Sequence, residues 1–347
     1  MSGRVVIDTS ESLTQKILNR RVLRFALGIG LAVAVSAIFS WPLAYIVPIF
    51  VAKFLVERQA PTVQTVYELL IAMLVTLAMG WLVSVGPTHY PSILLPLIAV
   101  GMLWAYYLFS HPKWNFFALI LIVATIVLPY LAILHPGAAM AVAYGLSLSG
   151  VVSVLIFALL HVLLPDLAEQ KDQYQLPELD KESREHEAFR ALLMAFPIIC
   201  FFYLLEITGA LLTMIMIAIL SQQTAGQKSV KVSLFLIIIN GIGGLLAIVF
   251  YNLLVTVPTL SFYIALSMLC AMLFGYKVYS DPAKAPIYAG IFSTLLVVVG
   301  STAASADADV ASNFYVRLAQ IFLVGIYMVI ASYYLETRNW SFLQQRK

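Results

Sequence analysis

Glu206 is a carboxylate inside an apolar sequence, FFYLLEITGALL, which runs from Phe201 to Leu212. A charged carboxylate within the hydrocarbon of a membrane is costly, so a glutamate in such a place is expected to be protonated or paired. One interpretation is that Glu206 takes up and releases a proton, or gates a substrate. The alternative is that it caps a turn between two helices at the outer headgroup level, where water solvates it.

Arg317 is the expected partner of Glu206, because the charge pattern described below puts both residues at the outer level of a membrane. A Glu206–Arg317 pair would cancel both charges. Alternatively, the Arg317 guanidinium would receive the carboxylate of an anionic substrate through two hydrogen bonds. A third interpretation is that the Arg317 side chain extends to the outer headgroups and has no further role.

Two apolar segments, Pro42–Leu55 and Ile207–Leu220, each hold 14 residues. At a rise of 1.5 Å per residue they are about 21 Å long, which is short of a full crossing. Paired short segments at matching positions of two halves are typical of a transporter's binding site. Trp41, Pro42 and Pro48 are therefore predicted to shape a path, and Pro48 also removes a backbone donor. The alternative is a pair of tilted hairpins that only pack.

Two further polar residues lie in apolar runs. Asn240 is expected to hydrogen-bond between helices or to line the path, and His161 is either a proton relay or a packed histidine. Both cysteines, Cys200 and Cys270, lie in apolar runs without metal-ligand spacing, so no metal is expected.

Several classes of protein are excluded by missing motifs. The sequence has no GxxxxGK[ST], HExxH or GxSxG motif and no carboxylate cluster, so we expect no catalytic residues, no enzyme activity and no cofactor. The net charge of +3 comes without a basic stripe, so nucleic acid is not an expected partner. Energy for any transport must come from an ion gradient or from another chain.

The elements that position these residues are long apolar runs. Hydrophobic residues make up 62% of the chain, charged residues 11%, and the mean hydropathy is +0.96. Because a bilayer satisfies no backbone polar groups, such runs must be helices, and we predict about twelve crossings. The predicted crossings are Val22–Phe39, Pro42–Leu55, Tyr67–Val85, Ser92–Phe109, Phe116–Leu134, Ala138–Leu164, Phe189–Leu205, Ile207–Leu220, Val232–Val255, Thr259–Tyr276, Ala285–Gly300 and Phe314–Leu335.

Lys and Arg alternate between the connections of these helices. They occupy both termini and every even-numbered connection, whereas the odd-numbered connections hold none, and Arg317 alone departs from this pattern. Because cytoplasmic loops carry the excess of Lys and Arg, this alternation predicts that both termini are cytoplasmic.

The chain also resembles itself at a spacing of roughly 165 residues. Arg24 opens RFALGIG and Arg190 opens RALLMAFP, and each opening is followed by a short second helix and four longer ones. Six crossings per half predict two parallel repeats. The predicted parts are a cytoplasmic N-terminal tail (1–21), a first six-helix repeat (22–164), a cytoplasmic linker (165–188), a second six-helix repeat (189–335) and a cytoplasmic tail (336–347).

The opening from Arg24 (RFALGIGLA), the Trp41-Pro42 turn and the short helix that ends near Phe54-Leu55 resemble the fusaric-acid-resistance (FUSC) and aromatic-acid-exporter superfamily. The resemblance implies an inner-membrane efflux pump for aromatic carboxylic acids and related compounds. Larger members carry a sizeable cytoplasmic domain after each six-helix unit. This chain has only a short linker and tail, and is more similar to the compact bacterial relatives encoded beside HlyD-type periplasmic adaptors.

The sequence therefore predicts an all-α polytopic integral membrane protein of the bacterial inner membrane. The expected function is proton-driven export of small aromatic or amphipathic anions, with the lipid bilayer and an HlyD-type adaptor as partners. The competing prediction is a non-transporting membrane scaffold that anchors an adaptor or assembly partner. No residue indicates an oligomeric state, and a homo-oligomer that matches an adaptor stays open.

Overall fold

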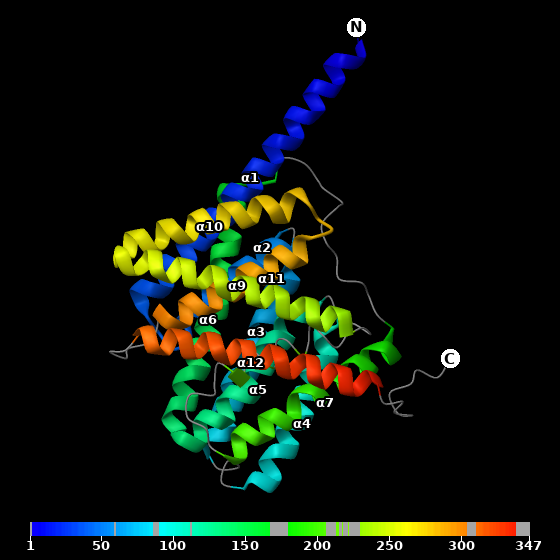
Figure 1. The fold of residues 1–347 in the computed structure, drawn as a ribbon, viewed down its shortest axis with the longest axis vertical. Helices are drawn as coiled ribbons and strands as arrows, with labels where there is room; N and C mark the ends of the chain where they lie inside the picture. The colour runs from blue at the N-terminus through cyan, green and yellow to red at the C-terminus, as the bar shows by residue number, and fades with distance from the viewer. Residues whose placement is uncertain are drawn as a thin grey trace. The chain divides into compact units, whose positions relative to one another are not determined.

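The computed structural model describes residues 2–58, 60–85, 90–111, 113–166, 180–205, 213–214, 217, 221, 230–303 and 310–337. Within these residues the chain is helical and contains no strand (Figure 1). The helices are α1 (Ser2–Phe39), the 3-10 helix η1 (Ala44–Ile46), α2 (Val47–Glu57), α3 (Val63–Val85), α4 (Pro91–Phe109), α5 (Asn115–Leu134), α6 (Pro136–Leu163), α7 (Lys181–Leu204), α9 (Val230–Thr256), α10 (Leu260–Ser280), α11 (Ala285–Ala303) and α12 (Val310–Thr337).

Nine of the described helices are long and apolar enough to cross a membrane, so the predicted all-α polytopic class is confirmed. A shorter apolar stretch, Phe322–Leu335, lies within α12. Besides the last predicted crossing, Phe314–Leu335 in α12, two further predicted crossings are not among the nine. The first, α2, has only 11 residues, and most of the second, Ile207–Leu220, lies outside the described residues. The predicted tail and first crossing form one continuous helix, α1.

The chain divides into two compact units that both draw on distant parts of the sequence. Unit 1 holds α1, α2 and the later part of α6, together with the later part of α9, α10 and α11. Unit 2 holds α3, α4, α5 and the early part of α6, together with α7, the early part of α9 and α12. The boundary between the units falls inside α6 and α9, so neither unit is a continuous half of the chain.

Unit 2 is built around α5, which is apolar on all sides and almost entirely buried. Helices α3 and α4 both pack against it, and α4 also packs against α7. The hydroxyl of Tyr203 on α7 donates to the carbonyl oxygen of Ile126 on α5 at 2.6 Å. In contrast, α3 exposes Leu70, Leu74 and Trp81, which is the pattern of a helix with one face toward lipid.

Unit 1 has α1 lying along α10 as its most extensive helix contact. Glycine allows this close approach, since a Cβ added to Gly275 would lie 3.0 Å from the Phe25 ring. Helices α9 and α11 also approach through a glycine. A Cβ on Gly243 would lie 2.7 Å from the backbone oxygen of Ile291 and 2.8 Å from the Cβ of Thr294.

The two units have corresponding packing. At the predicted spacing, α7 corresponds to α1 and α10 corresponds to α4. The α1–α10 contact of unit 1 therefore corresponds to the α7–α4 contact of unit 2, and both contacts are present. Each unit thus joins an opening helix of one half to the fourth helix of the other half.

The glycine contact of α9 with α11 yields a test. Gly243→Ala is expected to lower the unfolding temperature by about 3–8 °C, because overpacking against a backbone oxygen costs about 1–3 kcal/mol. Gly241→Ala, two residues earlier on α9, is the matched control, because the nearest atom to its added Cβ, on Phe322, lies 3.7 Å away. Thermal unfolding of the purified protein in detergent measures both. Equal unfolding temperatures for the two variants would contradict the described α9–α11 contact.

Candidate functional site

Neither side chain of the predicted pair, Glu206 and Arg317, is among those that the structure describes. Glu206 lies outside the described residues. Arg317 lies in α12, and its side chain is outside the part of the chain that the structure describes. Their proximity and their roles therefore stay predictions.

The Trp41-Pro42 turn links α1 to η1 and is fixed by α6. Ser40 and Leu43 adopt positive φ angles of 45° and 63°, which non-glycine residues rarely do. The Trp41 indole N–H donates to the Ser149 hydroxyl at 2.9 Å, and that hydroxyl donates to the Leu43 carbonyl at 3.3 Å. Pro42 is exposed within the turn. Side chains of α6 thus hold a backbone that would otherwise be strained.

Pro48 lies in the first turn of α2, where a helix leaves its backbone donors unpaired in any case. Pro48 therefore starts α2 and does not interrupt it. The Ser153 hydroxyl of α6 reaches the Val47 carbonyl at 3.4 Å, so this stretch of backbone also contacts α6. The expected short second helix is present, and at 11 residues it is about 16 Å long.

The two remaining predicted residues, Asn240 and His161, lie within described helices. Asn240 is buried in α9, with 8% of its surface exposed. The Nδ1 atom of His161 lies 2.8 Å from the Phe157 carbonyl of the preceding turn, and the two rings meet edge to face at 4.4 Å. These are the contacts of a packed histidine.

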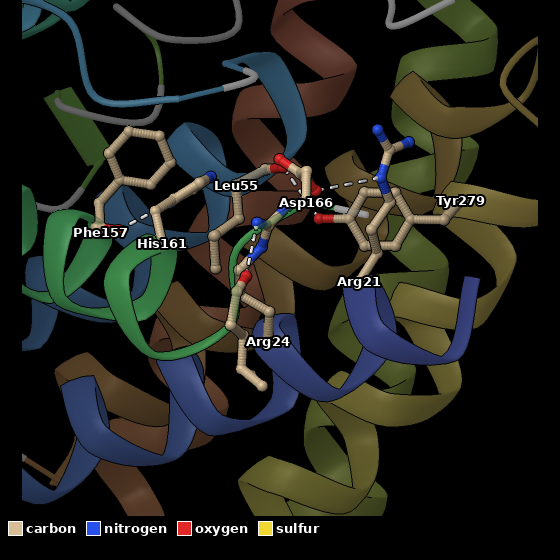
Figure 2. A network of polar contacts seen from close by, with 8 residues as sticks. Arg21, Arg24, Leu55, Phe157, His161, Asp166 and Tyr279 are labelled. Carbon is tan, nitrogen blue, oxygen red and sulfur yellow. Dashed lines mark hydrogen bonds and ion pairs between the residues drawn. The ribbon is translucent and has the colours of Figure 1, made fainter. Parts of the chain in front are cut away.

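Another polar constellation of unit 1 joins the middle of α1 to the end of α10 and to the residues after α6, and we call it the arginine corner: Arg21, Arg24, Asp166 and Tyr279 (Figure 2). Arg24 is only 2% exposed. Its Nη2 donates to Asp166 Oδ1 at 3.1 Å, and its Nη1 donates to the Leu164 carbonyl at 3.2 Å. The last turn of α6 and the residues after it thereby neutralise a buried cation on α1.

Tyr279 of α10 completes this corner. Its hydroxyl donates to the Leu55 carbonyl near the end of α2 at 2.8 Å. The Arg21 guanidinium lies 5.9 Å from the centre of the Tyr279 ring, and the Phe25 ring meets that ring edge to face at 6.1 Å. Four segments, α1, α2, α10 and the end of α6, are therefore tied together at one level (Figure 2).

Unit 2 contains a contact at the positions equivalent to Arg24 and Asp166. Arg190 of α7 donates to the Ser332 hydroxyl of α12 at 3.5 Å, and 142 residues separate these partners, as they separate Arg24 from Asp166. Also in unit 2, the Tyr106 hydroxyl of α4 lies 2.6 Å from the Ser221 hydroxyl. The repeat spacing thus reappears in the Arg190–Ser332 pair, in which a serine stands at the position equivalent to Asp166.

Sequence reasoning did not find the arginine corner. From the sequence, Arg24 is predicted only to mark topology and to open a repeat, and Asp166 falls within the predicted linker. The signal that was available is that Arg24 and Arg190 open equivalent helices, directly before apolar runs. A partner 142 residues away is not visible without the packing.

Residues 21–160 match a family described as "Protein of unknown function (DUF2955)". The matched residues begin at Arg21 and end in the last turn of α6. No curated protein matches the chain. No solved structure matches it either.

The turn between α1 and η1 gives a second test. Trp41→Phe removes the indole donor to Ser149, and is expected to destabilise the protein by about 1 kcal/mol, or a few °C in unfolding temperature. Trp81→Phe is the control, because the Trp81 side chain is 61% exposed on α3. Scanning calorimetry compares the two without relying on tryptophan fluorescence. An equal loss of stability in both variants would contradict the structural role of Trp41.

Proposed function

We propose that the chain is a secondary transporter that exports small aromatic or amphipathic anions across a bacterial inner membrane. The observation that carries this proposal is the corresponding construction of the two units, each of which joins helices from both halves of the chain. Internal repeats of membrane helices are a common architecture of secondary transporters. The expected absence of a P-loop makes the proton gradient the proposed source of energy.

The direction of transport follows from charge. Arg24, the end of α2, the end of α6 and the end of α10 meet in the arginine corner of unit 1. All four belong to connections that are rich in Lys and Arg, which we assign to the cytoplasm together with both termini. Guanidinium groups at this end would attract anions from the cytoplasm, which fits an exporter of anions.

The predicted residues take the following roles in this proposal. Glu206 carries the coupled proton, and Arg317 offers its charge to the substrate on the outer side. Trp41, Pro42 and Pro48 shape the outer part of the path, Asn240 lines the path, and His161 lies toward its cytoplasmic end. The resemblance to FUSC proteins supports an aromatic substrate and an HlyD-type periplasmic adaptor.

Efflux of a panel of aromatic acids from cells that express the chain, with and without an HlyD-type adaptor, tests this function. We expect an uncoupler to abolish the efflux, and Glu206→Gln and Arg317→Ala to lower it at least about tenfold, since each removes a charge that acts during transport. Asp309→Asn, which removes a carboxylate from the same predicted outer side, is the control. Wild-type efflux by folded Glu206→Gln and Arg317→Ala proteins would show that the site assignment is wrong.

An absence of efflux for every compound, with a folded protein that co-purifies with an adaptor, would favour a scaffold over a transporter.

The proposed orientation has its own test. In a protein with Cys200 and Cys270 replaced by alanine, single cysteines at Ala60 and at His135 report opposite sides of the membrane. We expect a membrane-impermeant maleimide added to intact spheroplasts to label His135→Cys and not Ala60→Cys, because the connection at Ala60 carries Lys53 and Arg58. Labelling of Ala60→Cys alone would show that the orientation is reversed.

A further inference from the structure

Within the described part of the chain, the arginine corner holds more positive charge than one carboxylate balances. Arg24 Nη2 lies 3.1 Å and Arg21 Nε lies 4.0 Å from the same oxygen, Oδ1 of Asp166. The neighbouring cation on α2, Lys53, is neutralised by Glu57 at 2.7 Å. Among the residues that the structure describes, two guanidinium groups therefore share one carboxylate, which leaves an excess of one positive charge.

Hydrogen-bond donors are also in excess there. The Nε atoms of Arg21 and Arg24 are buried and have no hydrogen-bond partner among the described residues. The Tyr279 hydroxyl does not help, because it is a donor as well and is committed to the Leu55 carbonyl. Buried charged donors without acceptors are costly, so the corner has a capacity for one more acceptor group.

Asp166 is the member of the corner that can leave it. It follows the end of α6 at Leu163, outside regular helix, and its side chain is 32% exposed, whereas the Arg24 side chain is 3% exposed. An anion that arrives from water therefore meets Asp166 first. The arginines stay fixed on α1, where the Leu164 carbonyl still binds Arg24.

We infer that the arginine corner binds the carboxylate of a small organic monoanion, and that Asp166 is a built-in competitor for the same guanidinium groups. The planar guanidinium fork matches a carboxylate through two hydrogen bonds, and one excess charge suits a single carboxylate. The choice of ligand rests on the proposed function. The corner would be the cytoplasmic docking site of the exported anion, separate from Glu206 and Arg317.

Benzoate binding to the purified full-length protein, measured by calorimetry in detergent, tests this inference. Asp166→Asn keeps the shape of the side chain and removes the competing charge, so benzoate should bind at least about fivefold more tightly than to wild type. Arg24→Lys keeps the charge and loses the fork, so binding should weaken at least about tenfold. Asp281→Asn is the matched control, because Asp281 pairs with Lys284 at 3.0 Å in the exposed connection after α10. The Asp281→Asn protein should bind benzoate with the same affinity as wild type.

A second readout separates binding from structural support. Asp166→Asn should unfold at a lower temperature than wild type without ligand, and benzoate should restore more of its stability than it adds to wild type. Arg21→Lys replaces Arg24→Lys if the latter does not fold, and should also weaken binding. A merely structural Asp166 would lower the unfolding temperature without rescue by benzoate, which would overturn the inference.

The outcomes distinguish this site from the proposed function. If the protein transports anions but the Asp166→Asn and Arg24→Lys variants bind benzoate as tightly as wild type, the site alone is overturned. Benzoate binding that Asp166→Asn strengthens, in a protein that moves no anion, would support the site and overturn export. No detectable benzoate binding by either wild type or Asp166→Asn would also overturn the site.

Discussion

The hydrocarbon of a membrane offers no hydrogen-bond partner, and this constraint governs the whole structure. It makes every described element a helix, and it demands a protein partner wherever the backbone leaves helical geometry or a charge is buried. The non-helical turn between α1 and η1 is accordingly held by Ser149 of α6. Arg24, 2% exposed, is likewise held by the Leu164 carbonyl and by Asp166. The later part of α6 and the residues that follow it thus supply hydrogen-bond partners both to the Trp41-Pro42 turn and to the buried Arg24.

The interleaving of the two halves follows from the same need for partners. A six-helix half that packed only against itself would not form the extensive contacts of α1 with α10 or of α7 with α4. Each unit instead places the opening helix of one half along the fourth helix of the other. The contacts of the two helix-opening arginines differ, because the position of Asp166 is taken by Ser332 in unit 2.

Run length and composition predict the helices, because a crossing of about 20 apolar residues is a local property. The shortness of α2 is predicted from its 11–14 apolar residues in the same way. The pairing of Arg24 with Asp166 could not be predicted, since it depends on packing between residues 142 positions apart. Pro48 shows the limit of local reasoning. It reads in the sequence as a helix interruption, but it starts α2 because the preceding turn is fixed by α6.

Transport by the chain alone is the central claim, and proteoliposomes test it most directly. Purified protein is reconstituted into liposomes loaded with labelled benzenesulfonate, an aromatic anion that stays ionised and crosses bare lipid slowly, and a proton gradient is then imposed. The account predicts gradient-dependent release well above that from liposomes without protein. Release equal to that of protein-free liposomes, from protein that unfolds at its usual temperature, would contradict a transporter and favour a membrane scaffold.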